Sequence, residues 1–297
     1  EEAILTRTKV SDLCDGDSPI HTVGKKESVK EIFNILTENK ILSVPVYDNR
    51  AGKYKTFIDI LDLLVYSVEV IGDDAIGAGY ETFSSHEKFV ASCGELSDRS
   101  HRNPFVAIDE NSSLQLAVNR MSKNKVHRLA TINSAGELRD LISQSAIVRF
   151  LSKNLDEFPV AEKTVQELSL GYREPISVPM SKSAFYAFEQ IVKNQISGIG
   201  VTNDDGEIVA NISASDLKKL GYDNYLLSNM FMTLDKFLVL DNESDEIPQL
   251  ISAKPSDTVG QVIQQFAKHK VHRLYVKDGT TTKGVITLSD VLALFTQ

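Results

Sequence analysis

The sequence predicts an α/β fold built from four copies of one β-α-β-β-α unit. Four segments align with one another without a gap, each running from a helix start through the strand after it, and they are residues 28–48, 113–133, 183–203 and 258–278. The residues that stand at matching positions further along are Asp62, Ala146, Asp216 and Asp290. Self-similarity of this kind is the signature of a repeat architecture.

The helix of each unit has one apolar face. In the first copy Val29, Ile32, Phe33 and Leu36 follow the spacing i, i+3, i+4, i+7, which is typical of an amphipathic helix. The residues expected at the N-caps are Ser28, Ser113, Ser183 and Thr258. In the first and last copies, Glu31 and Gln261 stand three residues later and predict capping boxes.

Two strands and a second helix complete each unit. The β-rich runs that follow the helices are 41–47, 126–132, 196–202 and 271–276. A polar turn and another strand then lead to the aligned Asp or Ala, where a second apolar helix begins. The sequence therefore divides into repeats at 1–70, 103–152, 173–222 and 248–297, separated by an insertion at 71–102, a linker at 153–172 and an insertion at 223–247.

Units of about 50 residues bury too little apolar surface to be stable alone, so we expect them to pair. The order of the chain suggests that the first repeat pairs with the second and the third with the fourth. Within the second insertion, the stretch 226–240 is apolar enough to dock on the rest of the protein.

Composition excludes several classes of function. The 297 residues are 42% hydrophobic and 25% charged, as in an ordinary globular protein, and the net charge of −9 disfavours a nucleic-acid partner. Cys14 and Cys93 form no CxxC motif, which predicts packing roles in a reducing, cytoplasmic compartment, with a nuclear location as a further option. No apolar run reaches the ~20 residues that a membrane-spanning helix needs.

The repeats resemble the CBS domain, which is used in pairs called Bateman modules. The residues that carry the likeness are KVHRLYVKDGTTTKGVITLSDVLALF at 270–295 and SSLQLAVNRMSKNKVHRLATIN at 112–133. They are similar to the fourth and second repeats of the γ regulatory subunits of AMP-activated protein kinase. Yeast proteins that restrain type 2A phosphatases have a similar build. The resemblance implies two Bateman modules packed as a pseudo-symmetric disc.

The resemblance also implies a non-catalytic sensor of AMP, ADP or ATP that regulates kinase subunits or a phosphatase. The implied ribose-binding residues are Asp290, Asp216 and Asp62. The implied phosphate-binding residues are His127, Arg128, His272 and Arg273, and the implied further contacts are Ser197, Ser213, Ser215, Thr287 and Ser289. These residue types suit the chemistry, since a carboxylate accepts from two hydroxyls and arginine offers a planar fork to a phosphate.

Some positions depart from the family pattern. Asp59 stands where the family usually has Ser or Thr, Ala146 replaces a ribose-binding Asp, and Leu42 and Ser145 replace cations of the kinase subunit. These departures favour an alternative, in which the chain is a constitutive interaction scaffold with degenerate sites. For each Asp the simpler interpretation is a helix cap. The sequence contains no GxxxxGK[ST], HExxH or GxSxG motif, so we expect neither catalysis nor a metal or cofactor.

Overall fold

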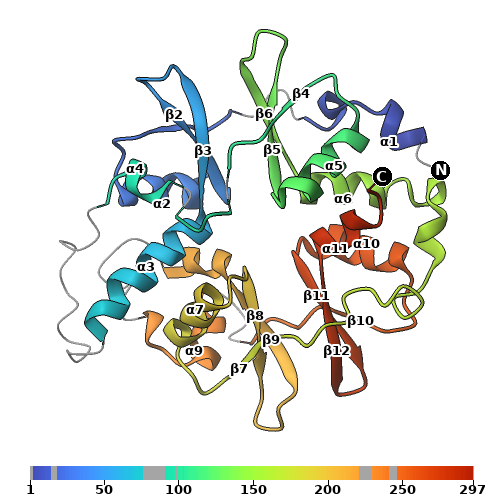
Figure 1. The fold of residues 1–297 in the computed structure, drawn as a ribbon. Coiled ribbons are helices and arrows are strands. Elements are labelled where there is room, and N and C mark those ends of the chain that lie inside the picture. The colour runs from blue at the N-terminus through green and yellow to red at the C-terminus, as the bar shows by residue number, and fades with distance from the viewer. Residues whose placement is uncertain are drawn as a thin grey trace. The chain divides into compact units, whose positions relative to one another are not determined.

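The computed structural model describes residues 3–14, 19–75, 91–97, 99–102, 104–220, 229–240 and 246–296. The chain forms two compact units (Figure 1). Unit 1 consists of Glu1–Ile20, Val106–Pro175 and Ile251–Gln297, and unit 2 consists of His21–Phe105 and Ile176–Leu250. The second and fourth repeats therefore lie in unit 1, and the first and third repeats lie in unit 2.

Each repeat contributes one three-stranded sheet, which confirms the repeat unit. In every sheet the first strand is parallel to the second, and the second is antiparallel to the third. The strands are β1 (Val23–Gly24), β2 (Ser43–Asp48) and β3 (Lys53–Asp59); β4 (Ala107–Asp109), β5 (Arg128–Ile132) and β6 (Leu138–Ser143); β7 (Ser177–Pro179), β8 (Gly198–Thr202) and β9 (Ile208–Ser213); and β10 (Ser252–Ala253), β11 (Arg273–Asp278) and β12 (Thr281–Thr287).

Two helices accompany each sheet, except that the last helix of the third repeat is a 3-10 helix. They are α2 (Val29–Glu38) and α3 (Ile60–Ala75), α5 (Leu114–Asn124) and α6 (Gln144–Ser152), α7 (Ala184–Lys193) and η6 (Ala214–Leu220), and α10 (Val259–His269) and α11 (Leu288–Ala293). The predicted capping boxes are confirmed, with Ser28 paired to Glu31 and Thr258 to Gln261. The apolar stripes are buried, as expected for amphipathic helices.

The helices decide how the repeats are grouped. In unit 1 the helices α6 and α10 pack together, and α11 contacts α5 and α6. In unit 2 the helix α3 packs against α7 and η6. Each unit has its own core of buried apolar side chains. The compact units thus join the second repeat to the fourth and the first repeat to the third through their helices. The pairing of the first repeat with the second and of the third with the fourth stays a prediction.

Segments between the repeats dock on the helix starts. Isolated antiparallel bridges join Lys9 to Ser113, Ser92 to Ser28, Thr164 to Thr258 and Thr233 to Ser183. The short helices that lie in or beside these segments are α1 (Ala3–Arg7), η1 (Val10–Leu13), α4 (Cys93–Leu96), η4 (Leu155–Glu157), η5 (Pro159–Glu162) and α9 (Leu234–Leu238). The start of the first repeat thus docks on the second repeat, and the segment before the second repeat docks on the first. The segment before the third repeat docks on the fourth, and the segment before the fourth docks on the third.

The predicted docking of the stretch 226–240 is confirmed for its described part, residues 229–240. Met230, Leu234 and Phe237 are fully buried in the core of unit 2. The Phe237 ring meets the Phe188 ring edge-on, with 5.7 Å between centroids. Residues 226–228 lie outside the described part of the chain, as do residues 76–90 of the first insertion.

The cysteines have the expected packing roles. Cys93 is buried in the core of unit 2, Cys14 lies against the core of unit 1, and both are free thiols. Burial raises the pKa of Cys14 to about 11 and that of Cys93 to about 12, so both are protonated at neutral pH. Among the helices of the described ranges, none is long and apolar enough to cross a membrane.

Candidate functional site

The four repeats share one arrangement where the last strand meets the second helix. The residue that ends this strand lies opposite the first residue of the middle strand, in the pairs Asp59–Ser43, Ser143–Arg128, Ser213–Gly198 and Thr287–Arg273. The residues just before the middle strands accept the backbone N–H of the first helical residue, and they are Leu42, His127, Ser197 and His272. The positions that the sequence aligns are therefore equivalent in space within each repeat.

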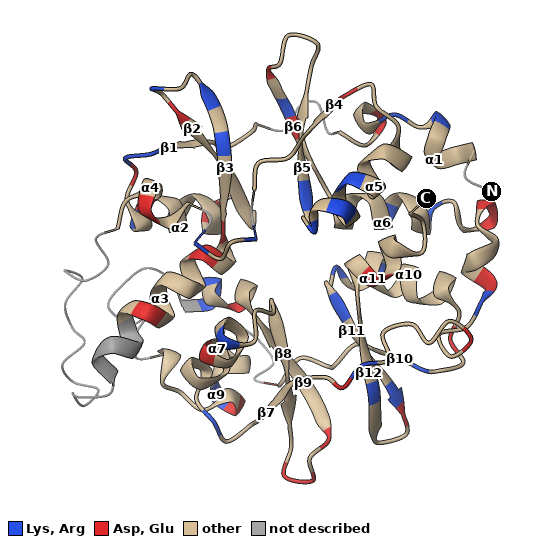
Figure 2. Ribbon diagram, viewed as in Figure 1, with Lys and Arg blue, Asp and Glu red and all other residues tan. Residues whose placement is uncertain are grey.

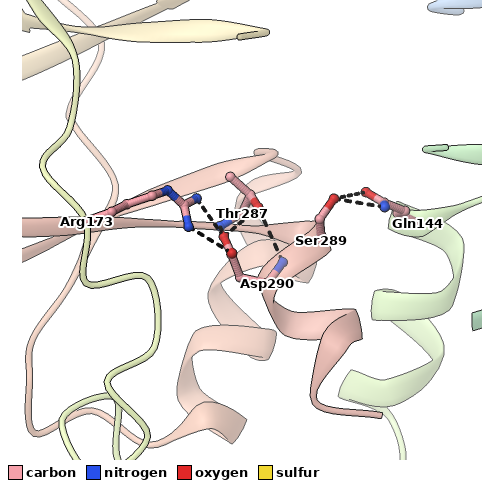
Figure 3. A network of polar contacts seen from close by, with 5 residues as sticks. All are labelled: Gln144, Arg173, Thr287, Ser289 and Asp290. Carbon is pink, nitrogen blue, oxygen red and sulfur yellow. Dashed lines mark hydrogen bonds and ion pairs between the residues drawn. The ribbon is translucent and has the colours of Figure 1, made fainter. Parts of the chain in front are cut away.

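The fourth repeat carries the most elaborate cluster (Figure 3). Thr287 caps α11, and its backbone N–H and hydroxyl donate to Oδ2 of Asp290 at 2.7 and 2.6 Å. Arg173 completes the cluster with two parallel hydrogen bonds, from Nη1 to Oδ1 at 2.9 Å and from Nη2 to Oδ2 at 2.8 Å. Partial burial opposes ionisation of Asp290, but Arg173 and Thr287 outweigh it and hold the pKa of the carboxyl below its usual value.

Sequence reasoning missed Arg173, which directly follows the linker 153–172 and lies in the segment Val106–Pro175 of unit 1. This linker is attached to the fourth repeat, since Val165 donates its N–H to the Asp257 carbonyl and Val285 donates to the Gly171 carbonyl, both at 2.9 Å. Gly284 makes the approach possible, because a Cβ there would lie 2.2 Å from the Gly171 oxygen. No local sequence pattern reveals this contact, because it joins segments that are distant in the chain.

Both His-Arg pairs lie in unit 1. In Figure 2 the beginnings of β5 and β11, where Arg128 and Arg273 start the strands, are marked by basic residues. Desolvation by the surrounding protein atoms lowers the pKa of His272, and the positive charges of Arg273 and Arg128 lower it further. Part of the residue is nevertheless exposed to solvent. The structure thus brings Arg128 of the second repeat close enough to act on His272 of the fourth. Such a group of cations favours a bound anion.

A second contact joins the same two repeats. Nε2 of Gln144, the first residue of α6, donates to Oγ of Ser289 at 3.0 Å (Figure 3). Gln144 is buried and Ser289 is exposed, so the hydroxyl lies at the surface end of this contact. In the second repeat, Ser143 caps the helix by accepting from the N–H of Ala146 at 3.2 Å. Ala146 offers no carboxylate, as the sequence indicates.

The third repeat holds Asp216 in unit 2. Its Oδ2 accepts the N–H and the hydroxyl of Ser213, both at 2.8 Å, and Lys219 lies 3.2 Å from its Oδ1. Ser215 is hydrogen-bonded to Ser213 at 2.7 Å between the hydroxyl oxygens. Ser197 precedes β8 in the same unit, so its contribution to a ligand at Asp290 stays a prediction.

Asp62 in the first repeat is fully buried. Its Oδ2 accepts the N–H of Asp59 at 2.9 Å, and its Oδ1 accepts the N–H of Ser100 at 2.8 Å. Asp59 in turn accepts the N–H of Asp62 at 3.1 Å. Burial and the neighbouring charge of Asp59 raise the pKa of Asp62 to about 7. A ribose could reach Asp62 only if the Ser100 segment moved, so the role predicted for this residue is untested.

The described residues contain no group of three or more His, Cys, Asp or Glu side chains that could hold a metal ion. The described junctions offer carboxylates at helix starts and cationic side chains at strand starts, which are groups that recognise hydroxyls and anions. In unit 1 the Asp290 carboxylate and the Arg273 guanidinium belong to one strand–helix junction.

Comparison with known proteins places these features in a family. The model of the CBS domain matches residues 10–69, 94–153, 169–223 and 245–296. The chain is 24% identical over 274 residues to 5'-AMP-activated protein kinase subunit gamma-3 of Sus scrofa, an alignment that covers 89% of this chain and 51% of the relative. It is 29% identical over 233 residues to SNF1-related protein kinase regulatory subunit gamma-1-like of Arabidopsis thaliana, covering 73% and 52%.

A third relative is Protein SDS23 of Eremothecium gossypii, which is 23% identical over 278 residues, covering 86% of this chain and 56% of the relative. The chain spans about half the length of the curated relatives it matches. Among solved structures it resembles MJ1225 of Methanocaldococcus jannaschii, described as a putative archaeal homolog of g-AMPK, with a TM-score of 0.76, 18% identity and coverage of 97% and 100%. Because the family model matches four segments that make up most of its length, the chain belongs to the CBS domain family.

Proposed function

We propose that this protein binds an adenine nucleotide in unit 1, performs no catalysis of its own, and reports the occupancy of its site to a protein partner. One observation carries the proposal. The strand–helix junctions of the second and fourth repeats contact each other in unit 1, where Gln144 donates to Ser289 at 3.0 Å, and these junctions carry the two His-Arg pairs and Asp290.

In this proposal the phosphate lies among His127, Arg128, His272 and Arg273. Charge-assisted hydrogen bonds from guanidinium groups to phosphate oxygens are worth about 1.5–3 kcal/mol each. The bound anion also removes the mutual repulsion of the cations. Asp290 accepts hydrogen bonds from the ribose hydroxyls.

The regulatory step is a population shift. A nucleotide held by strand starts of both the second and the fourth repeat stabilises one arrangement of β5, β11 and the helices that follow them. A partner that binds this arrangement better responds to nucleotide concentration. The names of the relatives favour kinase subunits as the partner, while the resemblance to yeast regulators favours a phosphatase. Co-purification from cytoplasmic extract, followed by identification of the retained enzyme, separates the two.

Isothermal titration with AMP, ADP and ATP tests binding. We expect saturable binding that Asp290→Asn weakens, because an amide cannot replace both carboxylate acceptors. Asp278→Asn is the matched control, since Asp278 is an exposed carboxylate at the far end of β11. Failure of all three nucleotides to bind, or equal affinity in the two variants, would contradict the proposed site.

A second candidate function is a constitutive interaction scaffold that no nucleotide controls. It is favoured by the finding that each of the three aligned carboxylates already has a donor from outside its own cap: Ser100 at Asp62, Lys219 at Asp216 and Arg173 at Asp290. For this function, dissociation constants weaker than about 1 mM for all three nucleotides are expected. Partner capture would then be the same with and without nucleotide.

A further inference from the structure

The Asp290 carboxylate has too few open acceptor positions for a vicinal diol. A carboxylate offers about four acceptor positions. In the structure Oδ2 of Asp290 accepts three hydrogen bonds, from the N–H and hydroxyl of Thr287 and from Nη2 of Arg173, and Oδ1 accepts one, from Nη1 of Arg173. One acceptor position, on Oδ1, therefore remains. A vicinal diol, which needs two of these positions, cannot bind while all four donors are in place.

The four donors differ in how firmly they are held. Thr287 belongs to the same helix start as Asp290, and its two bonds are part of the cap of α11. The Arg173 side chain follows the linker and remains 47% exposed, whereas the Asp290 side chain is 24% exposed. Water can therefore replace Asp290 as the partner of the guanidinium, so Arg173 is the donor that can leave.

The linker backbone stays attached when the side chain leaves. The Gly171 carbonyl accepts from Val285 at 2.9 Å and from Arg173 at 2.8 Å, and Gly171 has a φ of +70°, which glycine adopts without strain. The segment Val106–Pro175 of unit 1 ends two residues beyond Arg173. The Arg173–Asp290 pair is thus a side-chain anchor close to the point where the chain leaves the unit.

We infer that Arg173 is a built-in competitor for Asp290, and that a ligand with a vicinal diol must displace it to bind. Displacement of Arg173 leaves both acceptor positions of Oδ1 open, the number that a diol requires, while Oδ2 keeps its two bonds from Thr287. The inference rests on the proposed function and adds two consequences to it. The need to displace Arg173 lowers the affinity of the site for a ribonucleotide. Binding also releases the Arg173 side chain from Asp290, close to Pro175, where the chain leaves unit 1.

Substitution of Arg173 tests the inference by titration calorimetry. In Arg173→Gln the bidentate pair is lost, and we expect the affinity for AMP to rise about three- to tenfold. Arg173→Lys keeps the charge but loses the planar fork, so its affinity should lie between the two. A 2′,3′-dideoxy analogue of AMP has no diol to place on Asp290 and should gain little from either substitution.

Arg139→Gln is the control, since Arg139 is an exposed arginine on β6 of the same unit, and circular dichroism verifies that each variant folds. If AMP binds the wild type and Arg173→Gln with equal affinity, the inference is overturned but the proposed function is not. If AMP binds Arg173→Gln more weakly than the wild type, the inference is also overturned, because Arg173 would then be a ligand contact. Binding by Arg173→Gln but not by the wild type supports it. Failure of both proteins to bind AMP overturns the proposed function, and this inference with it.

Discussion

Arg273 lies directly opposite Thr287 in the antiparallel ladder of β11 and β12, and Thr287 is the residue that caps Asp290. One strand pair therefore presents a cation and a carboxylate at the same end. The equivalent ladder of the second repeat pairs Arg128 with Ser143. Ser143 caps the helix at Ala146, which stands in place of a carboxylate. Unit 1 thus combines two cationic strand starts with one carboxylate, as a ligand with one ribose and several phosphate oxygens requires.

Replacing Arg273 should weaken nucleotide binding. Arg273→Ala removes a charge-assisted donor, so we expect a loss of about 1.5–3 kcal/mol, a roughly 10- to 150-fold higher dissociation constant for AMP. Titration calorimetry measures the change. Arg139→Ala removes a similar charge from an exposed position on β6 and should bind AMP like the wild type. Equal affinities in the two variants would show that the Arg273 side chain does not contact the ligand.

Nucleotide binding should draw a proton onto His272. Crowding and the charges of Arg273 and Arg128 lower its pKa in the free protein, so the imidazole is neutral at pH 7. A phosphate beside it favours the charged form and raises the pKa. Binding is then linked to proton uptake, and this contribution to affinity grows as the pH falls from 8 to 6. Calorimetry in buffers of different ionisation enthalpy counts the protons.

His272→Gln keeps a hydrogen-bond donor but cannot titrate. We expect the variant to take up fewer protons on binding AMP than the wild type, while the titration of the phosphate itself contributes equally to both. Identical proton uptake in the two proteins would mean that His272 does not sense the phosphate.

Asp62 should make the protein less stable as the pH rises. Its pKa of about 7 in the folded state lies above the ordinary value of 3.8. Between pH 4 and 7 the folded state therefore keeps a proton that the unfolded state releases, and the free energy of unfolding falls as the pH increases. Each pKa unit corresponds to about 1.4 kcal/mol, so a shift of about three units changes the free energy of unfolding by roughly 4 kcal/mol.

Asp62→Asn resembles the protonated acid and should flatten this dependence. Thermal unfolding of both proteins from pH 5 to 8.5 measures it, with Asp278→Asn as an exposed control that retains the wild-type profile. Parallel curves for wild type and Asp62→Asn would show that Asp62 ionises normally.

Gly284 should be essential to the position of the linker. A Cβ at this residue would lie 2.2 Å from the Gly171 carbonyl oxygen, a backbone atom that cannot move without displacing the linker. We expect Gly284→Ala to destabilise the protein by about 1–3 kcal/mol, as overpacking usually does, and to loosen the Arg173–Asp290 pair. Thermal unfolding measures the effect.

Gly94→Ala is the comparison, because a Cβ there would meet its nearest neighbour at 3.5 Å, an ordinary contact. A small change in unfolding temperature for Gly284→Ala, similar to that of Gly94→Ala, would mean that the linker accommodates the methyl group.

The sequence alone was enough to find the repeat unit, the caps Ser28 and Thr258, and the equivalence of His127 and His272. These features depend on a helix, a strand and the turn between them, whose residues are neighbours in the chain. Hydrophobic periodicity and capping preferences therefore encode them directly.

Only the tertiary structure decided which repeats share a core and what surrounds each carboxylate. The packing of the second repeat with the fourth follows from the fit of whole helix faces, which no local pattern specifies. Ser100 on Asp62 and Arg173 on Asp290 are likewise contacts between segments distant in the chain. Residue type indicates that an aspartate can accept hydrogen bonds from a diol, but only the folded chain determines whether another donor already occupies it.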